Sequence, residues 1–281
     1  DYLRSMVHTT AVNITRMFGI TGRVIASSTA CTTSSQSIGF GYEMIKYGMQ
    51  DAMICGGADE YDTTTVAVFD NLLACSTAYN ESPGRTPRPF DRDRDGLVVG
   101  EGGGALLLEE YESAKRRGAP ILGEVIGFAC NNNGGDLILP NLEGITATLR
   151  LALADAAITP AAVDFVSAHA TATKMGDVIE SQAIADVYGD SGPHVTGLKS
   201  YMGHTMGTCG VIETVLTLYM MEQGFIAPTL NLEHVDPRCA MLRHVREITP
   251  AEVNIAAIQN FAFGGVNTCL LIKNGAALDE P

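Results

Sequence analysis

The sequence contains no tryptophan and few aromatic side chains, which make up 6% of its 281 residues. Basic residues are also scarce, because 18 lysines and arginines stand against 32 aspartates and glutamates and leave a formal net charge of −14. Nucleic-acid binding needs clustered Lys and Arg, and single strands also need aromatic stacking platforms. The composition therefore argues against a nucleic-acid partner.

Long apolar runs and cysteine motifs are missing as well. No stretch approaches the 18 consecutive apolar residues of a membrane-spanning helix, and no signal peptide opens the chain. The seven cysteines are odd in number, widely spaced and form no CxxC pair, which excludes a disulfide framework and a zinc ribbon. We therefore expect a cytoplasmic protein with free thiols and no membrane insertion.

What the sequence does contain is a regular alternation of short apolar runs and helical periodicities. Strands are expected at residues 24–26, 51–57, 121–129, 163–168, 195–198, 255–259 and 269–272, and paired strands about a glycine-rich turn at 96–109. Helices are expected after Cys31 and at 66–73, 110–117, 144–157, 177–188 and 205–223. Such alternation predicts an α/β fold with a buried, largely parallel sheet. One domain boundary is expected near 118–120.

Cys31 is the first candidate for chemistry. An apolar run at 24–26 leads into small and hydroxyl residues, and a helical periodicity begins directly after the cysteine. Unpaired N–H groups and the dipole at a helix N-terminus favour a thiolate over a thiol. The alternative is an inert core cysteine at a helix start.

Two histidines stand at similar junctions. His169 follows the expected strand at 163–168, and His204 lies between a short strand and a helix. Ligands of open α/β sheets bind at the carboxyl ends of strands, although a single histidine there often only caps a helix. One cysteine and two histidines could also ligate zinc, but their spacing matches no local ligand pattern, so we expect no metal.

Lys199 ends the expected strand at 195–198. A buried lysine must be paired, and Glu180 or Asp177 on the preceding helix could serve. The glycine run at 100–104 lacks the Lys-Ser/Thr ending of a phosphate loop, so a tight turn is the favoured interpretation. The glycine pair after Phe263 could present backbone N–H groups to an oxyanion.

Taken together, these segments resemble the β-ketoacyl-acyl carrier protein synthases, the condensing enzymes of the thiolase-like superfamily, and the elongating type I and II enzymes above all. The resemblance runs through nearly the whole chain in the family's order. It is carried by seven stretches: residues 28–34, 73–80, 88–96, 169–177, 199–204, 224–231 and 260–267.

The resemblance implies roles for the residues already singled out. Cys31 is similar to the nucleophile that accepts the acyl group, and Phe263 to the gating residue whose N–H completes the oxyanion hole with that of Cys31. His169 and His204 resemble the pair that acts on the malonyl unit. No cofactor or metal is expected, because the substrates are carried on the phosphopantetheine arm of the carrier protein.

Supporting roles follow in the same way. Lys199 resembles the family's structural and electrostatic lysine, paired with Glu180 and near Asp177. Thr171 and Thr173 resemble the contacts to the phosphopantetheine arm. The chain departs from the family's usual residues at five positions: Ser167 for Asn, Ala170 for Gly, Ala172 for Ser, Lys174 for Pro and Ala262 for Gly.

The implied fold has two similar βαβαβαββ halves in a layered α-β-α-β-α arrangement. We expect residues 1–119 to form an N-terminal half that carries the nucleophile, and residues 120–281 a C-terminal half that carries the histidine pair. The first strands and helices of the N-terminal half are expected to lie upstream of Asp1. Expected partners are an acyl carrier protein and either an identical or a related subunit, with residues 23–26 beside the two-fold axis.

Related proteins of other classes would differ from this sequence at particular residues. A thiolase would use a second cysteine in a C-terminal Cys-x-Gly, where this chain has Cys269-Leu-Leu. An initiating or chalcone-type synthase would have Asn in place of His204, and a chain-length factor would lack the nucleophile. The expected reaction is a decarboxylative Claisen condensation in fatty-acid biosynthesis, with a specialised polyene or polyketide pathway as the alternative.

Overall fold

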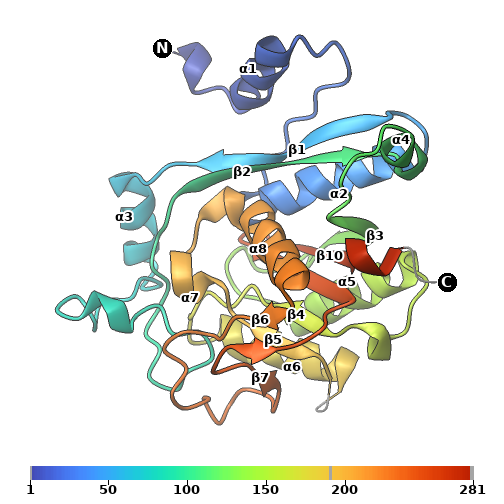
Figure 1. Cartoon of the computed structure of the whole chain (residues 1–281). Helices are drawn as coiled ribbons and strands as arrows, with labels where there is room; N and C mark the ends of the chain where they lie inside the picture. Colours follow the sequence, from blue (N-terminus) through green and yellow to red (C-terminus); the bar gives the residue numbers. More distant parts are fainter. Residues whose placement is uncertain (1, 190–191, 279–281) are drawn as a thin grey trace.

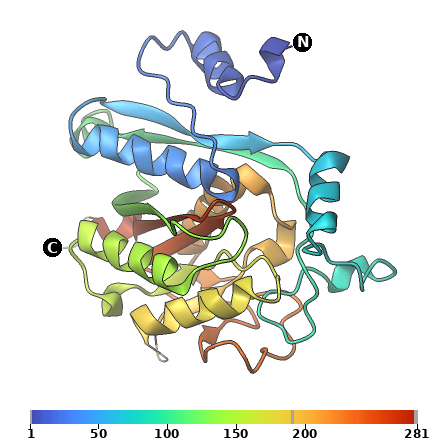
Figure 2. The same ribbon diagram turned by 180° about the vertical axis from the view of Figure 1, so that it is seen from behind.

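The computed structural model describes residues 2–189 and 192–278, in which two main sheets are separated by two helices (Figures 1 and 2). A two-stranded sheet lies on one side and a six-stranded sheet on the other. The helices between them are α2 (Thr33–Lys46) and α8 (Cys209–Gln223). Figure 2 shows α5 (Leu142–Asp155) and α6 (Gly176–Tyr188) on the far face of the larger sheet. The layers are those of the expected thiolase-like fold.

The larger sheet is mixed, where the sequence predicted a largely parallel one. Its strand order is β3-β10-β9-β4-β5-β7. β9, β4, β5 and β7 run parallel, whereas β10 is antiparallel to both of its neighbours. The reason is the tight turn at 263–265, which joins β9 to β10 without a crossover helix. The strands span Gly123–Asn132 (β3), Phe165–Ser167 (β4), His194–Thr196 (β5), Arg243–His244 (β7), Ile255–Ala262 (β9) and Val266–Asn274 (β10).

The C-terminal half follows the expected element order β3-α5-β4-α6-β5-α8-β9-β10, with small additions. Its main core lies between the larger sheet and helices α5 and α6, where Leu149, Ile184 and Leu271 are buried. The additions are α7 (Lys199–Met202), the edge strand β7, and β6 (Phe225–Ile226) paired antiparallel with β8 (Thr249–Pro250).

Local signals set several helix ends. Asn141 caps α5 by accepting a hydrogen bond from the Gly144 N–H, and Asp62 caps α3 (Thr63–Asn71) in the same way from Thr64. α4 (Tyr111–Arg116) is capped by Glu110. These helices match the expected ones to within a few residues.

The smaller sheet pairs β1 (Ala52–Asp59) with β2 (Gly102–Glu109) in antiparallel register. The predicted pair of strands about a glycine turn within 96–109 is wrong, because Gly102, Gly103 and Gly104 lie inside β2. A Cβ on Gly104 would stand 3.1 Å from the Val211 side chain, so glycine allows α8 to pack closely against this strand. Leu97 and Val99 make only isolated bridges, to Cys75 and His204.

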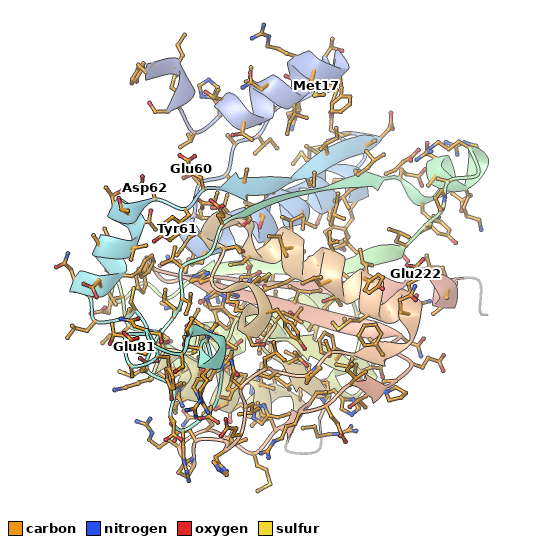
Figure 3. The ribbon with its side chains drawn as sticks, turned by 60° about the vertical axis from the view of Figure 1, so that its left-hand side comes forward. Met17, Glu60, Tyr61, Asp62, Glu81 and Glu222 are labelled. Carbon is orange, nitrogen blue, oxygen red and sulfur yellow. The ribbon has the colours of Figure 1, made fainter. Side chains whose placement is uncertain are left out.

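The predicted strand at 24–26 is also wrong. These residues lie in neither a strand nor a helix, and Val24 and Ile25 are exposed. A strand exists only through hydrogen bonds to a neighbour, and the described residues offer none at this place. The preceding helix α1 (Thr9–Phe18) buries none of its residues, and Figure 3 shows Met17 pointing away from the body of the molecule. None of the helices in the described residues is long and apolar enough to cross a membrane.

Candidate active site

Cys31 lies where the chain turns into α2. It sits in a single 3-10 turn, Ala30–Thr32, that leads directly into the helix, and its side chain is 7% exposed. Ala30 has a φ of +48°, the left-handed region that side chains normally avoid. Thr33 braces this turn, because its hydroxyl accepts from the Thr29 N–H and donates to the Ala30 carbonyl. The strained turn fixes the thiol in one place.

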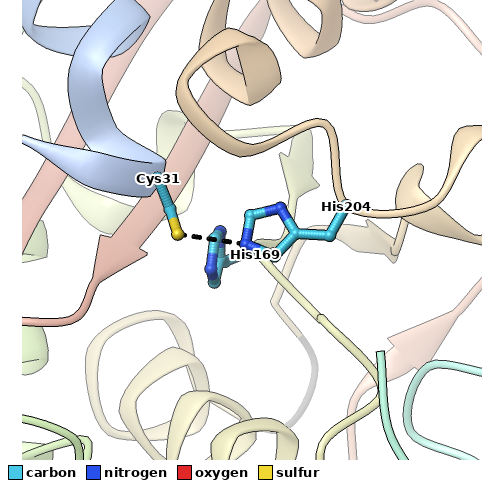
Figure 4. A group of neighbouring side chains, drawn as sticks. All are labelled: Cys31, His169 and His204. Carbon is cyan, nitrogen blue, oxygen red and sulfur yellow. Dashed lines mark hydrogen bonds between the residues drawn. The ribbon is translucent and has the colours of Figure 1, made fainter. Parts of the chain in front are cut away.

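The structure brings both predicted histidines to this thiol. His204 Nε2 lies 3.0 Å from Cys31 Sγ, and the His169 and His204 rings meet edge to face with centroids 5.4 Å apart (Figure 4). His169 directly follows Ala168 at the end of β4, and His204 follows α7. Both rings are buried. Residues 31, 169 and 204 thus form one cluster, from three separate loop segments.

Lys199 is buried beside His169, but its partner is not the one expected. Its Nζ lies 2.6 Å from Glu213 Oε1 on α8 and 3.2 Å from His169 Nδ1. Asn260 Nδ2 donates to the second Glu213 oxygen at 2.7 Å. The predicted Lys199–Glu180 pair is therefore wrong. Lys199 also begins the short helix α7, where the sequence suggested a strand end.

Glu180 and Asp177 serve the backbone of the histidine loop instead. The two Glu180 oxygens accept the N–H groups of His169 and Ala170 at 2.7 Å each. Asp177 accepts from the N–H groups of Phe90 and Ala172, and lies 3.6 Å from the Arg94 guanidinium. Burial raises the pKa of Glu180 to about 8 and that of Asp177 to about 6. These carboxyls hold the loop in place and do not reach Lys199.

Burial also shifts the pKa of the Cys31 thiol in the direction opposite to the one expected from sequence. Desolvation raises the pKa of the Cys31 thiol to about 12, despite the nearby Lys199 charge and the helix N-terminus. The sequence argument from the helix dipole predicted the opposite direction. The resting group is a neutral thiol, and its proton must leave when it attacks.

Both imidazoles are neutral. Burial and the positive charge of Lys199 hold the pKa of His169 and of His204 well below its usual value. The Lys199 ammonium has only donors, so His169 Nδ1 must accept from it, and the ring proton of His169 lies on Nε2. The cluster therefore offers an N–H donor from His169 rather than a proton acceptor.

Thr171, Thr173 and Phe263 lie in neighbouring loops. The hydroxyls of Thr171 and Thr173 are 3.1 Å apart, and the half-buried threonines flank Ala172, which has a φ of +65°. The Phe263 ring packs on Phe69 with centroids 5.6 Å apart, in the turn between β9 and β10.

The same cluster could hold a metal ion by size alone. Donor atoms of Cys31, His169 and His204 all lie within 4.8 Å of one another. Lys199 opposes this, because its ammonium stands 3.2 Å from His169 and would repel a cation. The absence of a metal stays a prediction.

Sequence reasoning missed the contacts that three residues make at the site. Glu213 and Asn260 form the charge network around Lys199, and Cys209 lies 3.0 Å from His204 Nδ1. Glu213 had one signal, because an acidic residue within the apolar periodicity of the helix at 205–223 needs a buried partner. Nothing in the sequence places Cys209 against a histidine five residues earlier.

Comparison with known proteins agrees with this geometry. The family described as beta-ketoacyl synthase, N-terminal domain matches residues 2–114, and beta-ketoacyl synthase, C-terminal domain matches residues 122–233. A crystal structure of a beta-ketoacyl synthase from Burkholderia phymatum STM815 is 47% identical, with a TM-score of 0.95 over 97% of this chain and 67% of that one. The chain belongs to the beta-ketoacyl synthase family.

Two further relatives bear on function. The 3-oxoacyl-[acyl-carrier-protein] synthase 1 of Escherichia coli (strain K12) is 38% identical over 256 residues, 91% of this chain and 62% of that protein. This chain thus spans about three fifths of the length of that curated relative. The second is a ketosynthase bound to the hexaketide, in complex with its type II polyketide synthase acyl carrier protein. It is 30% identical, with a TM-score of 0.93 over 97% of this chain and 68% of that one.

Proposed function

We propose that this protein is a 3-oxoacyl-[acyl-carrier-protein] synthase, an acyltransferase that joins an acyl group on Cys31 to a malonyl unit and extends it by two carbons. The observation that carries the proposal is the buried cluster of one thiol and two neutral imidazoles, with donor atoms within 4.8 Å. Chemistry on two thioesters needs a nucleophile and N–H donors in one desolvated place.

In the first step Cys31 accepts the acyl group. Its sulfur attacks the carbonyl carbon of an acyl thioester, and the bond to the pantetheine sulfur breaks. The departing sulfur takes up the proton that the Cys31 thiol loses, so the step is balanced. In this proposal the oxyanion is held by the backbone N–H groups of Cys31 and Phe263.

In the second step the malonyl thioester loses its carboxylate as CO₂. The electron pair left behind forms an enolate, whose oxygen accepts from the N–H groups of His169 and His204. The enolate carbon attacks the acyl carbon on Cys31, and the C–S bond breaks. A proton restores the Cys31 thiol, and a 3-oxoacyl thioester leaves on the carrier protein.

The remaining groups support these steps. Lys199 keeps the His169 proton on Nε2, and Glu213 neutralises the lysine. Thr171 and Thr173 hold the phosphopantetheine arm, and Phe263 gates the site. No cofactor or metal takes part. Residues 1–119 and 120–281 are the two halves, the chain works in the cytoplasm, and its partners are an acyl carrier protein and an identical or related second subunit.

A second candidate differs only in pathway. The 30%-identical ketosynthase is bound to a hexaketide. This relative supports a polyketide or polyene substrate as the alternative to a primary fatty acid. The chemistry at Cys31, His169 and His204 is the same in both.

The test is to load the full-length protein with acyl carrier proteins that bear acyl groups of different length and unsaturation. Mass spectrometry of the peptide that contains Cys31 then identifies the acyl group. Cys31→Ala should abolish acyl transfer, and Cys75→Ala, a half-buried thiol outside the cluster, should leave it intact. Acyl transfer that survives Cys31→Ala would refute the proposal. The preferred acyl group separates the two pathways.

A further inference from the structure

Cys209 is a buried thiol in contact with the site that the reaction above does not use. It is the first residue of α8 and is 0% exposed. Its Sγ lies 3.0 Å from Nδ1 of His204, whose Nε2 lies 3.0 Å from Cys31 Sγ on the other side of the ring. The His204 imidazole is therefore held between two thiols with different tasks.

The direction of the Cys209–His204 hydrogen bond follows from the other contact of Cys209. The Thr205 hydroxyl donates to Cys209 Sγ at 3.6 Å, so this contact does not use the thiol proton of Cys209, which is left to point toward His204. Burial raises the pKa of the Cys209 thiol to about 11, so the group keeps its proton at neutral pH. The S–H is then the donor that faces His204 Nδ1.

A ring nitrogen that accepts carries no proton in a neutral imidazole. With Nδ1 as the acceptor, the single proton of His204 must lie on Nε2, toward Cys31 and the reacting groups. Lys199 fixes the same tautomer in His169 by donating to its Nδ1 at 3.2 Å. The two histidines thus reach one protonation pattern through different donors, an ammonium for one and a thiol for the other.

We propose that Cys209 is a positioning residue that keeps the proton of His204 on Nε2, so that this ring donates to the enolate oxygen. The role rests on the proposed function, because it matters only where an N–H donor is needed. Cys209 touches neither substrate nor reacting atoms and acts through His204 alone. Partners that orient a functional histidine from behind typically change activity about 10–100-fold when removed, and a thiol is a weak donor, so we expect about tenfold.

Three variants separate hydrogen bonding from packing. Cys209→Ala removes the donor and leaves a gap, Cys209→Val fills the gap without a donor, and Cys209→Ser keeps a donor in a smaller side chain. Cys269→Ala is the matched control, because Cys269 is also a fully buried thiol but lies on β10 in the core between the larger sheet and α5. Each variant is made in the full-length protein.

The first readout is the tautomer of His204, from ¹⁵N NMR of protein labelled at histidine, with the signal assigned by its loss in His204→Gln. Wild type, Cys209→Ser and Cys269→Ala should show the Nε2–H form. Cys209→Ala and Cys209→Val should show a mixture of tautomers. The Nε2–H form alone in Cys209→Ala would overturn the proposal.

The second readout is malonyl decarboxylation, compared with acyl loading of Cys31. Cys209→Ala and Cys209→Val should lose about tenfold in decarboxylation and much less in loading, and Cys209→Ser should recover most of the loss. Rescue by valine and not by serine would mean that Cys209 only fills space. If wild type fails to decarboxylate malonyl thioesters, the proposed function fails, while the NMR result still decides the role of Cys209.

Discussion

The two halves of the molecule supply different parts of the chemistry. The half around the smaller sheet offers a thiol at the start of α2, and its strands β1 and β2 are partly exposed along most of their length. The half around the larger sheet offers both imidazoles and the buried Lys199–Glu213 pair, and its strands β9 and β10 are almost wholly buried. The charged Lys199–Glu213 pair and the two neutral imidazoles therefore lie beside the sheet that is more completely buried.

The halves meet at their central helices, which explains how the thiol reaches the histidines. The Ser35 hydroxyl on α2 donates to the Asn260 side chain on β9, and the Val211 N–H on α8 donates to the Ser34 hydroxyl at 3.1 Å. A Cβ on Gly210 would collide with the Ser35 backbone, at 2.7 Å from its nitrogen. The close approach of α2 and α8 therefore depends on a glycine and small hydroxyl residues.

The largest effect is expected when the two histidines are replaced, which tests whether the thiol and the imidazoles serve different steps. His169→Ala and His204→Ala should each lower malonyl decarboxylation by about 10²–10³-fold, because each removes one N–H donor to the enolate oxygen. Acyl loading, which depends on the thiol from the other half, should fall much less. Decarboxylation and loading are measured separately with radiolabelled thioesters. Loss of loading ahead of decarboxylation in both variants would contradict the division.

The next test breaks the charge network of the larger sheet. Lys199→Met leaves Glu213 buried without its cation, and should lower the free energy of unfolding by about 3–5 kcal/mol. Lys46→Met is the control, because that lysine pairs with Asp155 at 2.6 Å but both side chains are about one-third exposed. It should cost about 1 kcal/mol or less. Both free energies of unfolding are measured with denaturant. Equal losses in Lys199→Met and Lys46→Met would show that burial does not make the Lys199–Glu213 pair more important than the Lys46–Asp155 pair.

The pH dependence of the free energy of unfolding tests whether the two imidazoles beside the larger sheet are neutral. His169 and His204 have depressed pKa values, so on acidification the unfolded chain takes up protons near pH 6.5 while the folded chain does not. The stability that neutral imidazoles provide is thus present above about pH 6.5 and lost as the pH falls. His169→Asn should reduce this slope by about 1.4 kcal/mol per pH unit, because it removes one imidazole that stays neutral in the folded chain. An unchanged slope in His169→Asn, measured by denaturant unfolding from pH 5 to 7, would contradict a neutral His169.

The smallest expected effect compares left-handed residues in the two halves. Ala30 and Ala172 both have positive φ, beside the nucleophile and in the histidine loop. Glycine relieves about 1–2 kcal/mol of strain at each, against about 0.5–1 kcal/mol from the greater freedom of the unfolded chain. Ala30→Gly and Ala172→Gly should therefore stabilise by about 0–1.5 kcal/mol in thermal unfolding. The control is Ala147→Gly, on the exposed face of α5, which should lower the free energy of unfolding by about 1 kcal/mol. A loss of the same size in all three glycine variants would rule out backbone strain at Ala30 and Ala172.

The elements that could be predicted from sequence are those with a local cause. The helix after Cys31 and those at 144–157, 177–188 and 205–223 follow from apolar periodicity, and only the helix at 144–157 also has a capping side chain, Asn141. Five of the six strands of the larger sheet follow from short apolar runs between these helices, whereas the two-residue strand β7 was not predicted. The strand at 24–26 and the hairpin at 96–109 failed, because the first depends on a neighbouring strand and the second on how closely α8 approaches β2.

The sequence by itself determined which groups were candidates for chemistry, since Cys31, His169 and His204 lie in segments that resemble one family's motifs, and the structure brings all three side chains together. Only the tertiary structure decided how they are paired and protonated. Lys199 bonds Glu213, Glu180 holds backbone N–H groups, and burial keeps the Cys31 thiol neutral against the helix dipole. The physical reason is that desolvation and hydrogen-bond partners come from residues far apart in the chain, and these set a pKa more strongly than any neighbour in sequence.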